Sequence, residues 1–353
     1  MTQPLIVVKP VPVTAFVSTD VPEVAPAAYN AGTTYALAAT VGVAGAAGLV
    51  TVYESLQATN TGHMPASSPT WWKSLGTVYQ AYNAGTTYAL GDRVQDNTNH
   101  LIYESVVGGN VGNALTDVTK WIKVSKTNRY KAFDTSNSSA TTKPNSMSFR
   151  WTPGQGVGAV GVLNIQNATS MRRRVIDPVY GTVYDKTVDL SPLPASSDWW
   201  AWGFGVKSSP ALNVVTDLPA VYINADIQLD FTGGADLAIG TIVCGPLRQI
   251  GLAAQSGVRL SFKDYSKQNE NQFGDLELVE GNYSKLLTFQ VPMASDEVDQ
   301  TFELIASLRA TPCLWIGTQK YRSTVVYGIC AAPEIVIQGE RITDTTIQLR
   351  GLT

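Results

Sequence analysis

The chain has 353 residues and a formal net charge of −3, with 15% charged and 44% hydrophobic residues. This balance argues against a nucleic-acid-binding surface, which carries a clustered basic excess, and the hydrophobic content excludes a chain that is disordered throughout. With two histidines and three cysteines, neither a histidine-based metal site nor a disulfide scaffold is expected, and no metal or cofactor is predicted.

The first segment, residues 1–26, is rich in Pro and Val and is too short to form a core of its own. We therefore expect an extended N-terminal arm that lies over another subunit. The segment lacks the basic start and long apolar core of a secretory signal. No run of the chain approaches the ~18–20 apolar residues of a membrane-spanning helix.

An internal repeat follows the arm. The string from Ala28 to Leu37 recurs almost unchanged from Ala81 to Leu90, and later landmarks also match: Tyr-Glu-Ser from Tyr53 and from Tyr103, and Trp72 with Trp121. Alternating aromatic and polar residues punctuated by Gly-containing turns are typical of small antiparallel sheets. The sequence predicts two tandem β modules, residues 27–79 and 80–125.

Such small cores depend on a few aromatic side chains. We predict Tyr35, Tyr53 and Trp72 for the first module, and Tyr88, Tyr103 and Trp121 for the second. A pyranose ring can stack on an exposed aromatic side chain while polar neighbours bond its hydroxyls. Tyr82, His100 and Trp71 are therefore candidate glycan-binding residues, and the alternative is that they fill the module cores or contact neighbouring proteins.

The second module carries the pattern Tyr82-x5-Tyr88-x2-Gly91-Asp92-x-Val94, followed by Tyr103, Gly109-Asn110 and Trp121. This pattern resembles the short carbohydrate-binding module attached to many chitinases, whose relatives occur in phage tail and fibre proteins. The resemblance implies sugar binding. Two departures stand out: Glu-Ser follows Tyr103 in place of a Lys-Trp-Trp-like run, and Ala38-Ala39 replaces Gly91-Asp92 in the first copy.

Residues 126–245 show short alternating segments separated by turn residues, which predict a jelly-roll-like β-sandwich. The segments include 146–151, 159–165, 171–176, 220–224, 226–231 and 237–243.

Two clusters in this region invite a functional interpretation. The aromatic run from Asp198 to Gly205, read as a strand, places Trp200 and Trp202 in the core and exposes Trp199, the fourth candidate glycan-binding residue. The basic triplet Arg172-Arg173-Arg174 is expected on a solvated face or in an intersubunit ion pair, and an anion site is the alternative.

Residues 246–353 predict an α+β domain with one amphipathic helix at about 295–309. Ser295 or Asp296 can cap this helix. Val298, Phe302, Ile305 and Leu308 share one face.

The sequence contains only weak patterns of the kind that are typical of catalytic sites. The two histidines lie inside the repeats, no Gly-x-Ser-x-Gly elbow occurs, and the carboxylate pairs Asp275/Glu277 and Asp226/Asp230 lack supporting context. Cys244, Cys313 and Cys330 are expected to be buried free thiols, with a Cys313–Cys330 bridge left open. We do not expect an enzyme.

The second half also carries a resemblance. The order Thr127 to Asp134, Asp198 to Trp202, Gly245 to Arg248 and Leu308 to Trp315 resembles a group of tail-associated structural proteins of tailed phages. It implies a virion protein of the tail tip, baseplate or fibre-attachment region, made in the host cytoplasm and docked through its C-terminal domains.

The partners implied by this resemblance are other tail or baseplate proteins and further copies of the chain, with no nucleic acid. The alternative function is a receptor-binding protein for host-surface glycans, and a glycan hydrolase is the third possibility.

Overall fold

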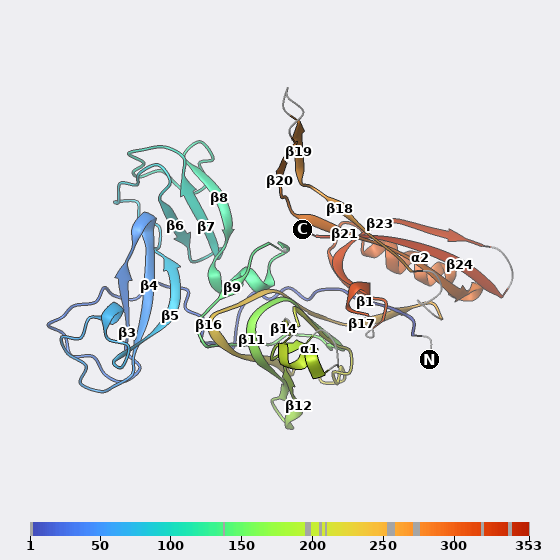
Figure 1. Cartoon of the computed structure of the whole chain (residues 1–353), viewed down its shortest axis with the longest axis horizontal. Helices are drawn as coiled ribbons and strands as arrows, with labels where there is room; N and C mark the ends of the chain where they lie inside the picture. Colours follow the sequence, from blue (N-terminus) through green and yellow to red (C-terminus); the bar gives the residue numbers. More distant parts are fainter. Residues whose placement is uncertain are drawn as a thin grey trace.

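The computed structural model describes residues 3–136, 138–194, 199–204, 207–208, 210–252, 258–270, 276–318, 321–337 and 341–352. The chain is mainly β, with several antiparallel sheets and one longer helix near the C-terminus, which confirms the predicted fold class. Two small sheets lie at one end of the molecule, a strongly bent sheet lies in the middle, and a larger sheet with its helix lies at the other end (Figure 1).

The repeats form two three-stranded antiparallel sheets with the same strand order. We call residues 27–79 module 1 and residues 80–125 module 2. Their strands are β3 (Thr40–Ala44), β4 (Leu49–Ser55) and β5 (Trp72–Tyr79), then β6 (Arg93–Asp96), β7 (Leu101–Ser105) and β8 (Trp121–Lys126). Module 1 also contains the 3-10 turns η1 (Ala46–Gly48) and η2 (Pro65–Ser67). The register shifts at the same place in both sheets, just before Tyr53 and just before Tyr103, so the duplicated sequence folds into a duplicated backbone.

The first hairpin turn of each module joins it to the next part of the chain. In module 1 the Gly48 carbonyl accepts the Gln80 N–H (3.0 Å), and Gly48 lies so close to the Arg93 backbone that a Cβ would collide with it. In module 2 the His100 carbonyl accepts the Thr127 N–H (2.9 Å). Module 1 therefore docks on module 2, and module 2 docks on the middle of the molecule.

The middle of the chain is organised by two long antiparallel strands that pair along most of their length, β11 and β16. The strands of this sheet are β2 (Ser18–Thr19), β9 (Thr141–Thr142), β10 (Ser146–Trp151), β11 (Ala159–Asp177), β12 (Gly181–Asp189), β15 (Leu212–Val215) and β16 (Asp226–Gly245). The predicted strands 159–165 and 171–176 are two halves of β11, just as 226–231 and 237–243 are two halves of β16. The segment 220–224, also predicted as a strand, forms turns instead.

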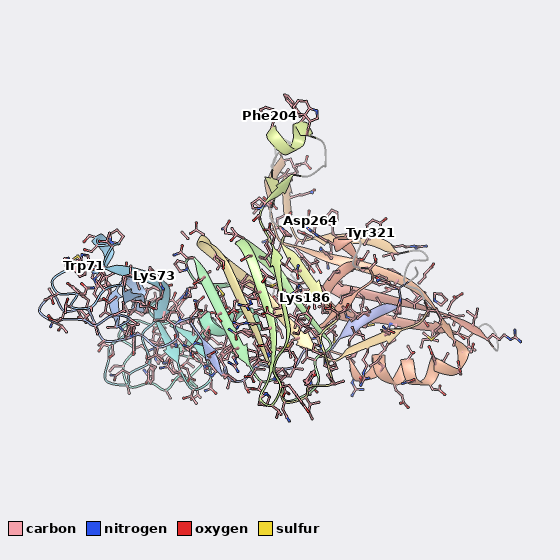
Figure 2. All side chains as sticks on the ribbon, turned by 90° about the horizontal axis from the view of Figure 1, so that it is seen from below. Trp71, Lys73, Lys186, Phe204, Asp264 and Tyr321 are labelled. Carbon is pink, nitrogen blue, oxygen red and sulfur yellow. The ribbon has the colours of Figure 1, made fainter. Side chains whose placement is uncertain are left out.

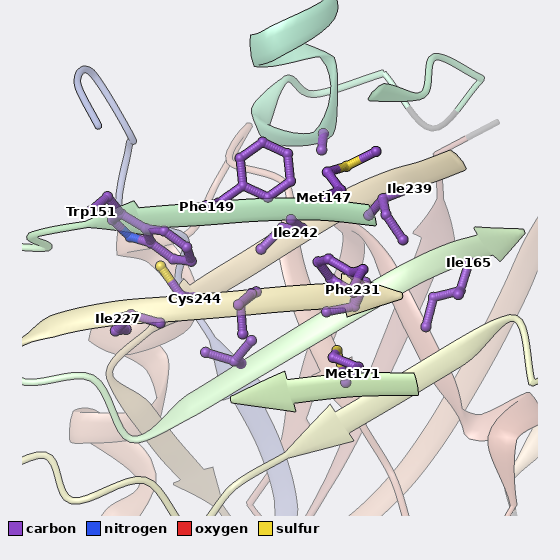
Figure 3. Close-up of a cluster of buried hydrophobic side chains, with 14 of the residues drawn as sticks. Met147, Phe149, Trp151, Ile165, Met171, Ile227, Phe231, Ile239, Ile242 and Cys244 are labelled. Atoms are coloured by element: carbon purple, nitrogen blue, oxygen red, sulfur yellow. The ribbon is translucent and has the colours of Figure 1, made fainter. Parts of the chain in front are cut away.

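This sheet bends at an irregular stretch of its register. The β11–β16 pairing shifts between Gln166 and Ser170, where Gly233 lies against the Asn167 backbone with no room for a side chain. The halves on either side of the bend enclose one core, so the two layers of the expected sandwich are halves of a single sheet. Phe149, Trp151 and Phe231 are at most 1% exposed in this core (Figure 3), and full burial of such a side chain contributes about 1.5–3 kcal/mol.

The C-terminal sheet has seven antiparallel strands in the order β17-β1-β22-β23-β24-β21-β18. Their bounds are β1 (Leu5–Val8), β17 (Leu247–Ile250), β18 (Arg259–Asp264), β21 (Tyr283–Ala294), β22 (Cys313–Ile316), β23 (Val325–Val336) and β24 (Ile342–Gly351). Short 3-10 turns are η3 (Asn128–Phe133), η4 (Ser295–Glu297) and η5 (Arg322–Thr324).

Two small hairpins complete the fold. The pair β19 (Lys267–Glu270) and β20 (Leu276–Val279) extends from the β18 end of the C-terminal sheet (Figure 1). The pair β13 (Leu193–Pro194) and β14 (Lys207–Ser208) carries the short helix α1 (Trp199–Phe204).

The N-terminal arm corrects one expectation, because it lies over its own chain and not over another subunit. Leu5–Val8 forms strand β1 between β17 and β22, and each of its residues is at most 9% exposed. The Val11 N–H then bonds the Cys244 carbonyl (2.8 Å), and β2 pairs with β10. The arm has no core of its own and instead completes two sheets, because a run of four apolar residues is most stable as a buried strand.

The predicted helix is present as η4 followed by α2 (Val298–Ser307). Ile305 and Leu308 are buried against the C-terminal sheet and Val298 packs beside them. Two details differ from the expectation: neither Ser295 nor Asp296 makes a side-chain cap, and Phe302 is 60% exposed. The helix crosses the sheet so that Phe302 lies beyond the buried stripe, near Pro333 and Ile335 of β23.

An apolar cluster joins the middle sheet to the C-terminal sheet. It contains Ala159 and Val243 from the outer side of the bent sheet together with Leu314 and Tyr327 from the C-terminal sheet. Gly161 allows this close approach, since a side chain there would collide with Leu314. The two sheets therefore share an apolar interface.

Candidate functional site

Both modules are built around the same buried polar bond. The Asn60 Nδ2 donates to Ser55 Oγ (3.0 Å) in module 1, and the Asn110 Nδ2 donates to Ser105 Oγ (2.9 Å) in module 2. Each Asn also donates to the backbone carbonyl just before the core tryptophan. These bonds identify which residues of the two modules correspond.

An aromatic trio fills each module. In module 2, Tyr88 and Trp121 pack edge to face with ring centroids 5.2 Å apart, and Tyr82 lies against both. The predicted glycan-binding residue Tyr82 is therefore part of the core: it is half-buried, and its hydroxyl donates to the Asn113 carbonyl (2.7 Å). Tyr29, Tyr35 and Trp72 form the matching trio of module 1.

Three of the predicted core residues are buried as expected, namely Tyr88, Trp72 and Trp121. Both tryptophans are 2% exposed. The remaining three, Tyr35, Tyr53 and Tyr103, are half-buried. The sequence reasoning left Tyr29 and Tyr82 out of the cores. Their identical position in the two repeats, one residue before Asn-Ala-Gly, was the signal for a shared packing role.

Trp71 lies in a different setting. Its ring stacks on the ring of His63, with centroids 3.8 Å apart and planes inclined by 14°, and both side chains are half-buried. The neighbouring Met64 is 60% exposed. Trp71 lies at the end of the molecule that is farthest from the C-terminal sheet (Figure 2). We call His63, Met64 and Trp71 the module 1 platform.

Module 2 lacks this platform. Lys120 stands at the position of Trp71, and Asn113 stands at the position of His63, as shown by the tryptophan Nε1 bonds to the His63 and Asn113 carbonyls. Asn113 donates to Asn110 Oδ1 (2.8 Å). The corresponding oxygen of Asn60 is buried and has no hydrogen-bond partner among the described residues.

His100, the third predicted glycan-binding residue, belongs to a joint between parts of the chain. Its Nδ1 lies 2.8 Å from Glu23 Oε1, and its ring stacks on Tyr130 with centroids 4.0 Å apart. Glu23 is 6% exposed and also accepts bonds from Thr127 (2.8 Å) and Arg129 (3.2 Å). The His100 ring is thus occupied by contacts that fasten the arm, module 2 and the middle domain together.

Trp199, the fourth candidate, corrects the expected secondary structure. Trp199–Phe204 is a helix and not a strand, so the predicted alternation of buried and exposed faces does not apply. Trp199, Trp200 and Phe204 are 74%, 57% and 72% exposed, so the prediction that Trp200 fills the core is wrong. The side chain of Trp202, the other predicted core tryptophan, lies outside the described residues. The helix projects from the body on the β13–β14 hairpin (Figure 2). Asp198 and Gly205 lie outside the described residues.

The four candidate residues therefore do not form one site. Tyr82 lies in the core of module 2, His100 in the joint with Glu23, Trp71 on the module 1 platform, and Trp199 on a projecting hairpin. Trp71 and Trp199 are the two candidates whose rings take no part in the module 2 core or the Glu23 joint. They belong to separate parts of the molecule, as the positions of Trp71 and of Phe204 at the end of α1 show (Figure 2).

The arginine triplet makes ion pairs within the chain. Arg172 binds Asp185 with two bonds (2.8 and 2.5 Å), and Arg174 binds Asp230 (2.7 Å). Arg172 lies on a solvated face, 48% exposed, and both ion pairs are formed within the chain. Arg173 points to the other face, is 5% exposed and donates to Asn213 (3.0 Å). Burial lowers the pKa of the Arg173 guanidinium from its ordinary value.

Of the carboxylates considered for catalysis, those whose side chains are described bind neighbouring side chains. Asp226 binds Arg150 and Thr152, and Asp230 binds Arg174 and Ser148. Asp275 lies outside the described residues, and so does the side chain of Glu277. Among the described residues there is no group of three or more His, Cys, Asp or Glu side chains placed to hold a metal ion.

The three cysteines are free thiols, so the open Cys313–Cys330 bridge is not formed. Cys244 and Cys313 are buried, and Cys330 is half-buried. Burial raises the pKa of Cys244 to about 12 and that of Cys313 to about 11, which keeps both in the unreactive thiol form at neutral pH.

A large exposed apolar surface was missed by the sequence reasoning. It covers β18, the hairpin β19–β20 and the start of β21, and we call it the hairpin surface. Its apolar and aromatic residues, 37–65% exposed, are Leu260, Phe262, Tyr265, Leu276, Leu278, Val279 and Tyr283. Alternation correctly predicted strands here, but it could not show that the apolar side of β18 lacks a covering layer.

No helix in the described part of the chain is long and apolar enough to cross a lipid bilayer. The sequence matches no protein-family model, no curated protein and no solved structure.

Proposed function

We propose that this chain is a structural component of a tailed-phage virion that docks through its C-terminal half and carries two carbohydrate-binding-like modules. The observation that supports docking is the hairpin surface. Leu260 and Phe262 lie on one side of β18 and are each more than half exposed, and exposed apolar surface of this kind marks interaction sites in soluble proteins. The outer edge of β18 also pairs with no strand among the described residues, which leaves backbone groups available to a partner.

The way in which the domains are joined fits an anchoring and presenting role. The arm completes the C-terminal sheet through β1 and the middle sheet through β2, and Glu23 then fastens it to module 2. A load applied at the modules is transmitted through these contacts to the C-terminal half. The proposed partners are other tail or baseplate proteins and further copies of the chain.

A single charge on the hairpin surface tests the docking role. Phe262→Glu should leave the thermal stability of the purified protein almost unchanged, because this side chain is already 65% exposed. The same variant should be absent from particles made in cells that lack the wild-type gene. Phe302→Glu, which alters a 60% exposed phenylalanine on α2, is the matched control and should be incorporated normally. Normal incorporation of Phe262→Glu would contradict the proposal.

Removal of the modules tests whether they are architectural. Glu23 and Thr127 are in hydrogen-bond contact (2.8 Å), so residue 26 can be joined to residue 126 by a short Gly-Ser linker while the arm stays in place. Particles that assemble but do not adsorb to cells would assign recognition to the modules. Failure of tail formation, with a folded purified variant, would assign them an architectural role.

A second function, binding of host-surface glycans, is supported by the module 1 platform. Module 1 has an aromatic stack and an unpaired buried Asn60 oxygen where module 2 has a complete Asn110–Asn113 bond. An unpaired buried acceptor costs about 1–3 kcal/mol, and a feature retained at such a cost indicates a role other than stability.

Trp71→Ala should then abolish signals of the full chain on an array of bacterial polysaccharides, whereas Lys120→Ala at the matching position of module 2 should leave them intact. Absence of any wild-type signal, or equal loss in both variants, would remove this second function. The glycan hydrolase has no observation of its own in the described residues.

A further inference from the structure

Strand β18, at the margin of the C-terminal sheet (Figure 1), presents two unlike sides. Each of its residues lies opposite a residue of β21, and opposite residues of antiparallel strands share a face. Leu260 lies opposite Leu287, which belongs to the core between the sheet and α2. Leu260 and Phe262 are therefore on the α2 side of the sheet, and Arg259 and Lys263 are on the other side.

The α2 side of β18 is apolar and uncovered. Leu260 and Phe262 are 53% and 65% exposed. The Phe262 ring packs edge to face on the ring of Tyr283, with centroids 6.2 Å apart, and Tyr283 is itself 56% exposed. Removing such surface from water contributes about 25 cal/mol per Å² of apolar area. This side of the strand therefore favours an apolar neighbour.

The other side of β18 is basic. Arg259 and Lys263 are exposed there. Arg350 of β24 joins them, because its Nη2 donates to the Tyr265 hydroxyl (2.6 Å) and Lys263 Nζ lies 5.1 Å from the centre of the Tyr265 ring. The ion pairs of the described residues include none of these three cations. This side therefore favours a negatively charged neighbour.

The backbone is open along the same strand. The Tyr265 N–H donates to the Asn282 carbonyl (3.0 Å), which continues the pairing of β18 with β21 by one residue. Antiparallel strands alternate between bonded and non-bonded residue pairs, so the N–H and C=O groups of Leu260 and Phe262 point away from β21. Among the described residues no strand pairs with this edge. Main-chain bonds from a partner can therefore extend the sheet.

We propose that the β18 edge binds an extended segment of another protein in which acidic and apolar residues alternate. The added strand places acidic side chains beside Arg259 and Lys263 and apolar side chains beside Leu260 and Phe262, since opposite residues share a face. A small anion would use only the basic side, and an apolar cap would use only the α2 side. This inference rests on the docking role proposed above and specifies the chemistry of the partner.

The test is a titration of the full chain with a peptide of four Glu-Val repeats, with hydrogen exchange followed by NMR. Binding should saturate and should slow the exchange of the outward N–H groups of Leu260 and Phe262. A peptide of four Lys-Val repeats should bind about tenfold more weakly, because like charges then lie opposite each other. The fully N-methylated Glu-Val peptide cannot donate main-chain bonds and should not bind.

Charge reversal in β18 has a matched control. Lys263→Glu should weaken binding of the Glu-Val peptide about fivefold and strengthen binding of the Lys-Val peptide. Lys123→Glu makes the same charge change at an exposed lysine of module 2 and should leave the binding of both peptides unchanged. Circular dichroism and melting temperature show whether each variant is folded, and Arg259→Gln replaces Lys263→Glu if that variant is not.

No saturation at about 1 mM Glu-Val peptide, or equal binding by folded Lys263→Glu, would overturn the proposal. Binding without slower exchange at Leu260 and Phe262 would also overturn it, because the β18 edge would not be the site. A wild-type dimer that Lys263→Glu dissociates in sedimentation experiments would assign the edge to a second copy and would overturn the foreign strand. If the strand fails while Phe262→Glu is still absent from particles, the docking role itself stands.

Discussion

Modules 1 and 2 share an identical ten-residue string, the same strand order and the same buried Ser–Asn bond, yet they differ at one corner. Module 2 closes that corner with the Asn113–Asn110 bond (2.8 Å), whereas module 1 has the His63–Trp71 stack and leaves the Asn60 oxygen unpaired among the described residues. Because the rest of the framework is the same, this difference marks the place where module 1 acquired an aromatic surface.

The modules also differ in what they dock against. The first hairpin turn of module 1 contacts module 2 at Arg93, whereas the same turn of module 2 contacts the middle domain and the buried Glu23. Module 2 therefore supports module 1 at this turn, and module 1 has a second neighbour in the middle sheet, where Gly76 approaches the Thr142 carbonyl. Repeated sequence thus produces a directional arrangement, since each copy meets a different neighbour.

The largest expected effect tests whether the stability of module 1 depends on module 2. Trp121→Ala removes a core side chain that is 2% exposed, at a cost of about 3–5 kcal/mol to module 2. Hydrogen exchange should show lost protection in both modules, because module 1 loses the surface on which it docks. Trp72→Ala, the matched change in module 1, should affect module 1 alone. Loss confined to module 2 in Trp121→Ala would refute the direction of support.

The next effect concerns the divergent corner. Asn113→Ala leaves the Asn110 oxygen unpaired and should destabilise module 2 by about 1–3 kcal/mol. His63→Ala breaks no side-chain bond to Asn60, so it should cost module 1 less, about 1 kcal/mol, through the lost ring stack. Module-resolved hydrogen exchange measures both free energies of opening. A larger loss for His63→Ala would show that the corners do not differ as described.

Exchanging alanine and glycine at one left-handed backbone position should change the stability of the two modules by a smaller amount and in opposite directions. Ala38 has φ 63°, where module 2 has Gly91 with φ 86°, and a left-handed conformation is unfavourable for alanine. Ala38→Gly should stabilise module 1 by about 0.5–1 kcal/mol, and Gly91→Ala should destabilise module 2 by about 1 kcal/mol. Thermal melts of the two variants measure these shifts, and a destabilised Ala38→Gly protein would contradict the argument.

The smallest effect is a difference in acid sensitivity. Burial raises the pKa of Asp96, but the stronger combined effect of hydrogen bonds from Asn99 and Thr98 and the charge of His100 lowers it below 3.8. Because the pKa of Asp96 is lower in the folded state than in the unfolded state, the ionised carboxylate stabilises module 2 at pH values above the unfolded-state pKa. This stability is lost as the pH falls through the folded-state pKa. Module 1 has Val43 at this position, as its strand pairing shows.

Hydrogen exchange corrected for intrinsic rates should therefore weaken in module 2 relative to module 1 between about pH 5 and pH 3. Asp96→Asn should reduce this difference. An equal acid response of both modules in the wild type would remove Asp96 as its cause.

Local patterns in the sequence were enough to predict several elements. The repeat predicted both modules, because identical strings with identical turn residues fold alike. Alternation predicted β10 and parts of β11 and β16, and the helical spacing of Val298, Ile305 and Leu308 predicted α2. Trp71 was nominated from the alternation of adjacent tryptophans in a strand, but it lies in the turn just before β5, which begins at Trp72.

Other features depend on neighbours that are distant in sequence. The arm was predicted to be extended, but its partners, β17 and β22, lie more than 200 residues away, and no local pattern identifies them. His100 was a plausible sugar contact until Glu23 and Tyr130 were seen to occupy its ring. Trp199 was misplaced because an aromatic run has no clear period, so it was read as a strand.

The sequence by itself determined that this protein is mainly β, that it contains a duplicated module, and that it has one longer helix near its C-terminus. Those properties follow from local periodicity and turn chemistry, which act over a few residues. Only the tertiary structure decided that one bent sheet supplies both layers of the middle domain, that the hairpin surface is uncovered, and that His100 meets Glu23 and Tyr130. Each of these depends on which faces meet, and burial of a face is decided by the packing of the whole chain.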